Sequence, residues 1–361
     1  MLTPGPVPVL DRIAKAQTQG MITHRSKDFT RLYGGLVERA RGYFNCHEAF
    51  VLTGSGATGL EALVVNLVPV GAKSLVLTNG EFGDNMAKTF MVFGKPVVAR
   101  LEDGQGWNLE RSKEKIDAYT AGSDPAIALG ILHNETSMGV RNDVAKICAY
   151  AKSKGMITIV DGISAWPGTP MNMIDDNIDG YVVASQKGPG APPGLAMIGL
   201  SETAVSIYRS RTDVPSYTLD LKRHGTRFDK DKQTPNTPAI ATMYALVEAF
   251  NVIDELGGLE ASVRRHEEGA KYTRERLTEL LLPLISEAGF ESNTVTGFVA
   301  SSAEKAKAIK EGLAREGIQI VGSRGKFEKT GLRVAHMANF TREELVMCFD
   351  TMARILTELR T

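Results

Sequence analysis

Residues 49–67 read AFVLTGSGATGLEALVVNL. The first five residues predict a buried β-strand, residues 59–67 predict a helix, and Gly54, Gly56 and Gly59 lie at the turn between them. Glycine lets the backbone approach an anion closely, and the N-terminus of a helix offers unpaired N–H groups and the positive end of its dipole. The stretch therefore predicts a strand, a turn and a helix that together bind a phosphate group.

Short apolar runs continue after this unit and alternate with helical patterns as far as about residue 238. Helical patterns cover residues 59–67, 84–93 and 142–154. Buried strands that alternate with helices are typical of a parallel sheet covered on both faces. We therefore expect an α/β fold with a mostly parallel seven-stranded sheet, with strands at Ala49–Thr53, Ser74–Thr78, Pro96–Arg100, Ala126–Leu132, Ile157–Val160, Gly180–Ala184 and Leu195–Gly199.

The pattern changes after QTPNTP, residues 233–238. Long helical patterns and two short strand signals follow, at 239–256, 259–282, 292–300, 303–316, 331–335 and 342–359. They predict a smaller α+β domain at the C-terminus. We divide the chain into a Pro-rich, extended N-terminal arm (1–20), a large domain (21–240) and a small domain (241–361).

The composition excludes several classes of protein. In 361 residues, 42 basic side chains balance 42 acidic ones, so the net charge gives no argument for binding nucleic acid or an anionic membrane. The basic run Lys222–Lys232 also contains acids and predicts a solvated loop. The three cysteines lie far apart, neither a secretory signal nor a membrane-spanning run is visible, and the six histidines show no metal-binding spacing. We therefore expect a cytoplasmic enzyme or binding protein with no metal site.

The glycine turn fits more than one ligand. Residues 54–59 match the string G-x-G-x-x-G, and Glu81 follows the next predicted strand, where an acid would bind the ribose of a dinucleotide. A nicotinamide-dependent oxidoreductase is thus one alternative. A turn whose glycines only tighten the passage from strand to helix is another.

A second pair of residues favours a different cofactor. Asp161 ends one predicted strand, and Lys187 follows another and precedes a Gly/Pro-rich loop. In an open parallel sheet the carboxyl ends of the strands border the ligand crevice, so both side chains can meet beside the glycine turn. A lysine in apolar surroundings has a lowered pKa and can act as a Schiff-base nucleophile. A helix N-terminus, a carboxylate and such a lysine are the groups needed to hold pyridoxal phosphate.

The chain resembles the class V aminotransferases of fold type I, in the branch of the alanine–glyoxylate and serine–pyruvate or serine–glyoxylate aminotransferases. The resemblance covers nearly the whole length. It is carried by motifs in the family's order: PGPVPV, THR at residues 23–25, GSGATGLEA, NGEFG, HNETSMGV, VDGISAW, SQKGPGAPPGLA, TPNTPAI and GLRVAH.

The resemblance implies a pyridoxal 5'-phosphate cofactor and a role for each matching residue. Lys187 resembles the lysine that binds the cofactor and moves the substrate proton, and Asp161 resembles the carboxylate on the pyridine nitrogen. The remaining cofactor-binding residues are the phosphate contacts Ser55, Gly56, Ala57 and Gln186, the ring contacts Phe82 and Thr136, and Thr234 and Thr237, which reach the phosphate of the neighbouring subunit. This last role implies a homodimer with shared active sites.

The substrate would be held by Arg333, as a clamp on the α-carboxylate, and by the backbone of Gly5. Some of these residues also have simpler interpretations: Phe82 as core, Thr234 and Thr237 as turn residues, Arg333 as part of an ion pair and Gly5 as a bend.

The resemblance predicts a transaminase with a ping-pong mechanism. Alanine or serine would donate the amino group, and glyoxylate or pyruvate would accept it. Aspartate or an aminophosphonate is an alternative donor. A class V lyase of the cysteine desulfurase kind is a further alternative, but it needs a thiol on a mobile loop, and Cys148 and Cys348 lie in helical patterns while Cys46 lies beside a strand. A non-catalytic cofactor-binding module would be expected to lack Lys187, Asp161 or Arg333.

Overall fold

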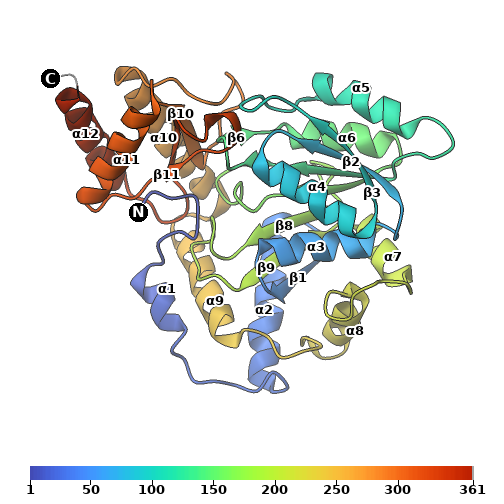
Figure 1. Cartoon of the computed structure of the whole chain (residues 1–361). Helices are drawn as coiled ribbons and strands as arrows, with labels where there is room; N and C mark the ends of the chain where they lie inside the picture. Colours follow the sequence, from blue (N-terminus) through green and yellow to red (C-terminus); the bar gives the residue numbers. More distant parts are fainter. Residues whose placement is uncertain (360–361) are drawn as a thin grey trace.

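The computed structural model describes residues 1–359 (Figure 1). A seven-stranded sheet forms the centre of the larger part of the chain, in the order β1-β9-β8-β7-β4-β2-β3. Neighbouring strands from β3 to β8 are parallel, and β9 is antiparallel to both β8 and β1. The expected mostly parallel sheet is thus confirmed, with strands β1 (Glu48–Thr53), β2 (Lys73–Thr78), β3 (Lys95–Arg100), β4 (Ala128–Leu132), β7 (Ile157–Asp161), β8 (Gly180–Ala184) and β9 (Leu195–Leu200).

Helices cover both faces of this sheet because successive strand residues point to opposite sides. Val182 packs into the core on one face and Val183 into the core on the other. The first face carries α3 (Gly56–Leu67), α4 (Glu81–Phe93), α7 (Glu202–Ser210) and α8 (Leu221–Asp231). The second carries α2 (Lys27–Phe44), α5 (Leu109–Thr120), α6 (Val144–Ser153) and α9 (Ile240–Glu255).

The C-terminal part is built on a three-stranded antiparallel sheet in the order β10-β12-β11. Its apolar core includes side chains from three long helices and both longer strands. The elements are α10 (Gly258–Glu279), β10 (Val295–Val299), α11 (Ala303–Arg315), β11 (Val321–Gly322), the 3₁₀ turn η1 (Gly325–Phe327), β12 (Gly331–Ala335) and α12 (Arg342–Glu358). A short hairpin, β5 (Asn134–Glu135) and β6 (Val140–Arg141), completes the described strands.

Two local predictions were wrong. The basic run Lys222–Lys232 is not a solvated loop: most of it forms α8, whose start is capped by Asp220 and which buries Leu221 and His224. The N-terminal arm is not wholly extended, because residues 11–16 form helix α1 (Asp11–Ala16). Arg12 on α1 is paired with Glu248 and Glu255 on α9, and such a partner far along the chain is invisible to a local pattern.

The division into an arm, a large domain and a small domain remains a prediction. The apolar side of α9, after residue 240, packs into the core beside the larger sheet. Among the described helices, none combines the length and apolar character that crossing a membrane requires.

Candidate functional site

A cavity of about 260 Å³ lies at the edge of the sheet where β4, β7 and β8 end. Asp161 is the last residue of β7, and Lys187 lies three residues beyond the end of β8. The turn between β1 and α3 supplies a third side of the cavity. The cavity brings together eight residues that the sequence predicted: Ser55, Gly56, Ala57, Phe82, Thr136, Asp161, Gln186 and Lys187.

The Lys187 ammonium group lies beside a backbone carbonyl rather than in water. Its Nζ donates a hydrogen bond to the carbonyl oxygen of Pro4. Burial lowers the pKa of Lys187 to about 8, Asp161 acts in the opposite direction, and Arg333 lowers the pKa further. A substantial fraction of the side chain is therefore a neutral, nucleophilic amine near pH 8.

Burial also shifts the pKa of the Asp161 carboxyl group, but upwards rather than downwards. Its Oδ1 accepts a hydrogen bond from the backbone N–H of Ile163 at 2.8 Å. Burial raises the pKa of Asp161 to about 7, although this hydrogen bond and the charge of Lys187 both lower it. A cationic group placed against this carboxylate would stabilise its charged form.

The glycine turn delivers the N-terminus of α3 to the cavity. Ser55 is the residue before the helix, and its backbone N–H donates to Thr58 Oγ1 at 3.2 Å. N–H groups of a first helical turn have no partner inside the helix, so those at Gly56 and Ala57 are available to an anion. A side chain at position 56 would bring its Cβ within 2.4 Å of Ile163 Cδ1, so only glycine allows this close packing.

These residues fit pyridoxal phosphate. The anion-binding turn, the buried carboxyl group and the amine of lowered pKa surround one cavity, as the phosphate, pyridine nitrogen and aldehyde of that cofactor require. Among the described residues, Gln186 Oε1 and Asn134 Oδ1 are buried without a hydrogen-bond partner and belong to residues that line the cavity. Unsatisfied buried polar atoms are costly, and a bound polar ligand can satisfy them.

Sequence analysis did not single out Asn134 and Ser164, which also line the cavity. The Asn134 amide donates to Ser164 Oγ at 2.8 Å, and Thr136 Oγ1 donates to the same oxygen at 2.6 Å. Both residues lie inside motifs that had been recognised, HNETSMGV and VDGISAW, so the signal was present in the sequence.

Arg333 lies next to the cavity, on β12 of the C-terminal sheet. It is 6% exposed, and burial lowers the pKa of its guanidinium to about 10. Nε and Nη2 donate to the carbonyl of Gly322 at 3.0 and 2.6 Å, and Nη1 donates to the carbonyl of Thr136 at 2.7 Å. A guanidinium has five N–H groups, so one N–H on each terminal nitrogen remains for a carboxylate.

The remaining predicted residues lie outside the cavity lining. Gly5 packs against Lys187: a Cβ at position 5 would lie 2.5 Å from Lys187 Cδ. Thr234 is buried, with its hydroxyl donating to the carbonyl of Asn236 at 2.7 Å, and Thr237 is exposed. The structure of one chain therefore does not bring these two threonines to the cavity of that chain.

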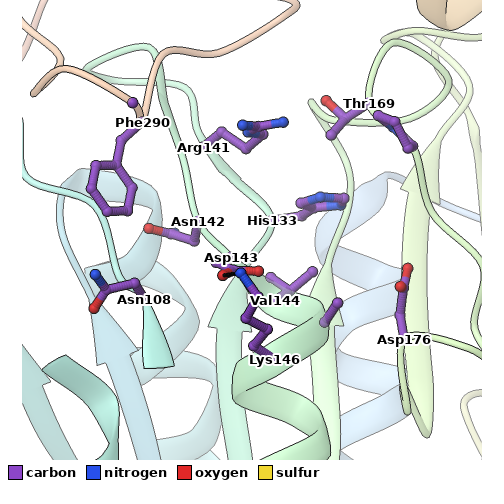
Figure 2. A pocket seen from close by; sticks show the side chains of 13 residues that line it. Asn108, His133, Arg141, Asn142, Asp143, Val144, Lys146, Thr169, Asp176 and Phe290 are labelled. Atoms are coloured by element: carbon purple, nitrogen blue, oxygen red, sulfur yellow. Dashed lines mark ion pairs between the residues drawn. The ribbon is translucent and has the colours of Figure 1, made fainter. Parts of the chain in front are cut away.

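A larger cavity, of about 590 Å³, lies among α5, α6 and the turn before β10 (Figure 2). It contains both cationic and acidic side chains, including Arg141, Lys146, Asp143 and Asp176. Lys146 is paired with Asp143 at 3.0 Å. This cavity contains none of the predicted site residues and lacks the combination of lysine, carboxylate and glycine turn, so we place the site in the smaller cavity.

Comparisons with known proteins show the family of this chain and its fold. Residues 5–344 match the family model described as aminotransferase class V. An uncharacterized aminotransferase of Methanocaldococcus jannaschii is 31% identical, over 99% of this chain and 93% of its own. The alanine–glyoxylate aminotransferase of Callithrix jacchus is 28% identical, over 99% and 87% of the two chains. The solved structure of an alanine–glyoxylate aminotransferase from Nostoc sp. superposes with a TM-score of 0.91 at 24% identity, covering 98% of this chain and 95% of that one.

Proposed function

Because this chain belongs to the class V aminotransferase family, we propose that it transfers the amino group of alanine or serine to glyoxylate or pyruvate. It is a transaminase, and its cofactor is pyridoxal phosphate. The observation that carries the proposal is the cavity that joins Lys187, Asp161 and the N-terminus of α3, with Arg333 beside it. The volume of this cavity is about 260 Å³.

Each side chain has a task that its surroundings support. Lys187 would hold the cofactor covalently through Nζ and, once released, would carry the proton to and from the substrate Cα. Asp161 would hold the pyridine nitrogen in its protonated form. The N–H groups of Gly56 and Ala57 and the hydroxyl of Ser55 would bind the phosphate, with Gln186 as a further contact.

The cofactor supplies an electron-accepting ring that stabilises negative charge at the substrate Cα. Phe82 would pack on that ring, and Thr136 would lie beside it. Arg333 would bind the α-carboxylate of the amino acid and of the 2-oxo acid through its two remaining N–H groups, with the backbone of Gly5 alongside. These contacts fix the substrate relative to Lys187, which removes most of the entropic cost of the proton transfer.

A half-reaction titration tests this function. Alanine, serine, aspartate and 2-aminoethylphosphonate would each be added to the cofactor-loaded protein while the visible absorbance of the cofactor is followed. We expect alanine or serine to remove the visible absorbance band of the lysine-bound cofactor, and glyoxylate or pyruvate to restore this band. Lys187→Ala should lack the lysine-bound band, and the exposed Lys271→Ala is the matched control. Discharge by aspartate or the phosphonate alone would reassign the donor, and a protein that binds no pyridoxal phosphate would contradict the proposal.

A homodimer with shared active sites also belongs to the proposal. Thr237 is exposed in the single chain, so a partner's phosphate site can reach it, whereas Thr234 is buried and its hydroxyl would have to leave the carbonyl of Asn236 to take part. We expect a dimer in gel filtration with light scattering, and a weaker cofactor affinity in Thr237→Ala even though Thr237 lies outside its own chain's cavity. A monomer that binds the cofactor normally would refute this arrangement. We also assign the protein to the cytoplasm, because Cys46, Cys148 and Cys348 are buried free thiols.

A further inference from the structure

The orientation of Arg333 depends on a loop that joins two strands of the C-terminal sheet. Two of its three hydrogen bonds go to the carbonyl of Gly322, the last residue of β11. Residues 323–330 then connect β11 to β12, where Arg333 itself lies. A displacement of this connecting loop would move the Gly322 carbonyl and rotate the guanidinium away from its present direction.

Three polar contacts among nitrogen and oxygen atoms fasten the connecting loop to the larger part of the molecule, in addition to the packing of Phe327 against a cluster that includes Met138 and Val140. Ser323 Oγ donates to the carbonyl of Ser137 at 2.6 Å. Arg324 and Glu81 form an ion pair at 3.3 Å, but both side chains are about half exposed, so this pair contributes little. The third contact is made by a buried carboxylate: the backbone N–H of Lys326 donates to Asp103 Oδ2 at 2.9 Å. A charged acceptor makes a hydrogen bond roughly twice as strong as a neutral one.

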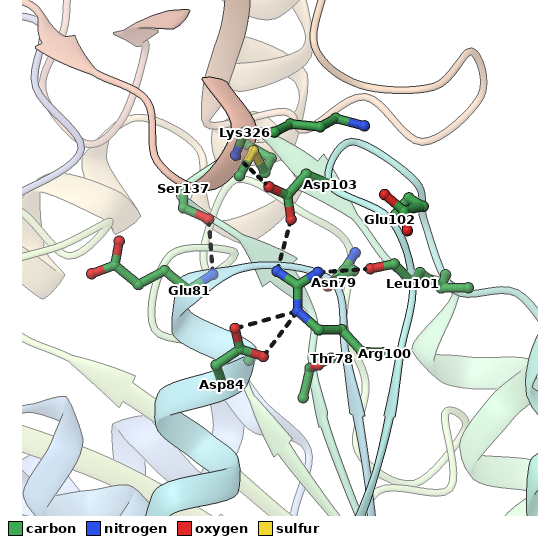
Figure 3. Close-up of polar contacts among 12 residues, drawn as sticks. Thr78, Asn79, Glu81, Asp84, Arg100, Leu101, Glu102, Asp103, Ser137 and Lys326 are labelled. Atoms are coloured by element: carbon green, nitrogen blue, oxygen red, sulfur yellow. Dashed lines mark hydrogen bonds and ion pairs between the residues drawn. The ribbon is translucent and has the colours of Figure 1, made fainter. Parts of the chain in front are cut away.

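Asp103 is itself held rigidly (Figure 3). Its Oδ1 accepts a hydrogen bond from Arg100 Nη2 at 2.8 Å, and Arg100 Nε lies 3.4 Å from both carboxylate oxygens of Asp84 on α4. The loop approaches Asp103 closely because position 325 is glycine. At Gly325, φ is +57°, and a Cβ would lie 2.1 Å from Asp103 Oδ2.

We infer that Asp103 is a positioning residue for Arg333. By holding the N–H of Lys326, the Asp103 carboxylate fixes the loop 323–330, and through it the Gly322 carbonyl that orients the guanidinium. This rests on the proposed role of Arg333 in binding the substrate carboxylate. Asp103 touches neither the cavity nor Arg333, so its effect is on substrate binding rather than on proton transfer.

Two variants at position 326 compare loss and retention of the N–H. In Lys326→Pro the ring Cδ also takes the place of the hydrogen that points at Asp103 Oδ2, so this variant removes the hydrogen bond and pushes the loop away from Asp103. Lys326→Pro removes the backbone N–H, and Lys326→Ala removes the same side chain but keeps the N–H. Proline is compatible with the φ of a 3₁₀ turn. We expect Lys326→Pro to raise KM for both substrates about tenfold while kcat stays within about threefold, since misplacing a binding group weakens binding without removing a proton carrier. Lys326→Ala should behave as wild type.

Substitution of Asp103, the hydrogen-bond acceptor, gives a second test. Asp103→Ala should reproduce the KM increase, and Asp103→Asn, which retains a carbonyl acceptor, should restore part of the loss. Asp84→Asn is the control, because the ion pair of Asp84 with Arg100 is exposed and contributes little, and Asp84 does not touch the loop. In the double variant Asp103→Ala with Lys326→Pro, the two effects should not add, since both remove one interaction. Equal KM values in wild type, Asp103→Ala and Lys326→Pro would overturn the inference.

Two readouts do not require the transaminase reaction. Hydrogen exchange of peptides covering residues 320–332 should be faster in Asp103→Ala than in wild type, and unchanged in Asp84→Asn. Binding of propanoate, a carboxylate without an amino group, should weaken by the same factor as KM rises. If wild type has no transaminase activity but exchange and propanoate binding change as expected, the proposed function fails and the positioning role stands. Faster exchange with unchanged propanoate binding would show that Asp103 anchors the loop without positioning Arg333. That result would overturn the inference.

Discussion

At the scale of single residues, burial acts on Lys187 and Asp161 in opposite directions. Loss of water disfavours the charged form of each, so the pKa of the lysine falls to about 8 and that of the aspartic acid rises to about 7. Each charge also stabilises the other. The amine and the carboxyl group therefore titrate close together and near neutral pH, which suits the proposed roles of Lys187 as nucleophile and proton carrier.

The first prediction concerns the pH dependence of cofactor attachment. Only the neutral amine of Lys187 is a nucleophile, so the rate at which the cofactor-free protein attaches pyridoxal phosphate should rise about tenfold per pH unit below the pKa and level off above about pH 8. Stopped-flow absorbance measures this rate. In Arg333→Gln the midpoint should move to higher pH, because the arginine charge lowers the lysine pKa. An unchanged midpoint in this variant would contradict the assignment.

Asp161→Asn should shift the midpoint of the pH dependence of cofactor attachment to lower pH. The Asp161 charge raises the pKa of Lys187, so its removal should lower the midpoint of attachment below pH 8. The variant should also lose about 100-fold or more in kcat, because nothing then holds the pyridine nitrogen protonated as the substrate Cα gains negative charge. Steady-state kinetics and the attachment rate measure the two effects separately, and a loss of activity with an upward shift of the midpoint would not fit this account.

At the scale of elements, the N-terminal arm lies against the lysine of the cavity. The backbone of Leu2 pairs with Gln319 and Ala335 in the C-terminal part, at 2.8 and 2.9 Å, and the N–H of Val7 donates to the carbonyl of Gln186 at 3.1 Å. Between these contacts the arm passes over the Lys187 side chain. It thus connects the small sheet to the loop after β8.

Gly5→Ala should disturb this arm. Gly5 has a φ of +107°, which side-chain-bearing residues rarely adopt, and a Cβ there would lie 2.5 Å from Lys187 Cδ. We expect the arm to move off Lys187 and KM for both substrates to rise about tenfold. Gly20→Ala is the control, since a Cβ at position 20 meets nothing within 4 Å. Equal KM values in the two variants would show that the arm does not shape the site.

At the scale of the whole molecule, two neutral histidines lie buried behind the small sheet. His336 lies between Thr296 Oγ1 and the carbonyl of Asn293, both at 2.8 Å, and His266 accepts a hydrogen bond from the N–H of Ala338 at 3.2 Å. Burial lowers the pKa of His336 to about 3 and that of His266 to about 4. Neither can take up a proton in the folded state at mildly acid pH.

His266 and His336 should therefore lower the stability of the folded state as the pH falls. A histidine in the unfolded chain binds a proton below about pH 6.5, whereas folded His336 does not until about pH 3, so each such group costs about 1.4 kcal/mol per pH unit between these values. Between pH 7 and 5 the free energy of unfolding of wild type should fall by about 2 kcal/mol more than that of His336→Gln. Urea unfolding at both pH values measures the difference. Glu135 and Asp161, whose pKa values burial raises, act in the opposite direction but equally in both proteins.

Local patterns predicted the strands of the large sheet because a strand buried on both faces is apolar at nearly every position, as in β4, β8 and β9. They failed at α8, where two of its buried residues are His224 and Gly225 and the helix is stabilised by packing on its neighbours rather than by its own apolar content. The motifs likewise located Lys187, Asp161 and the glycine turn, since each functional group follows directly on a strand that the sequence predicts.

Motifs and contacts that are local in the chain thus predict the α/β fold, the family and eight of the residues that line the cavity. How the cavity joins its surroundings depends on contacts between distant residues: the bond of Asp103 to Lys326, 223 residues apart, the bonds of Arg333 to Gly322 and Thr136, and the contact of Gly5 with Lys187. The physical reason is that these contacts link separately formed elements through backbone groups, and every residue type except proline carries the same N–H and carbonyl.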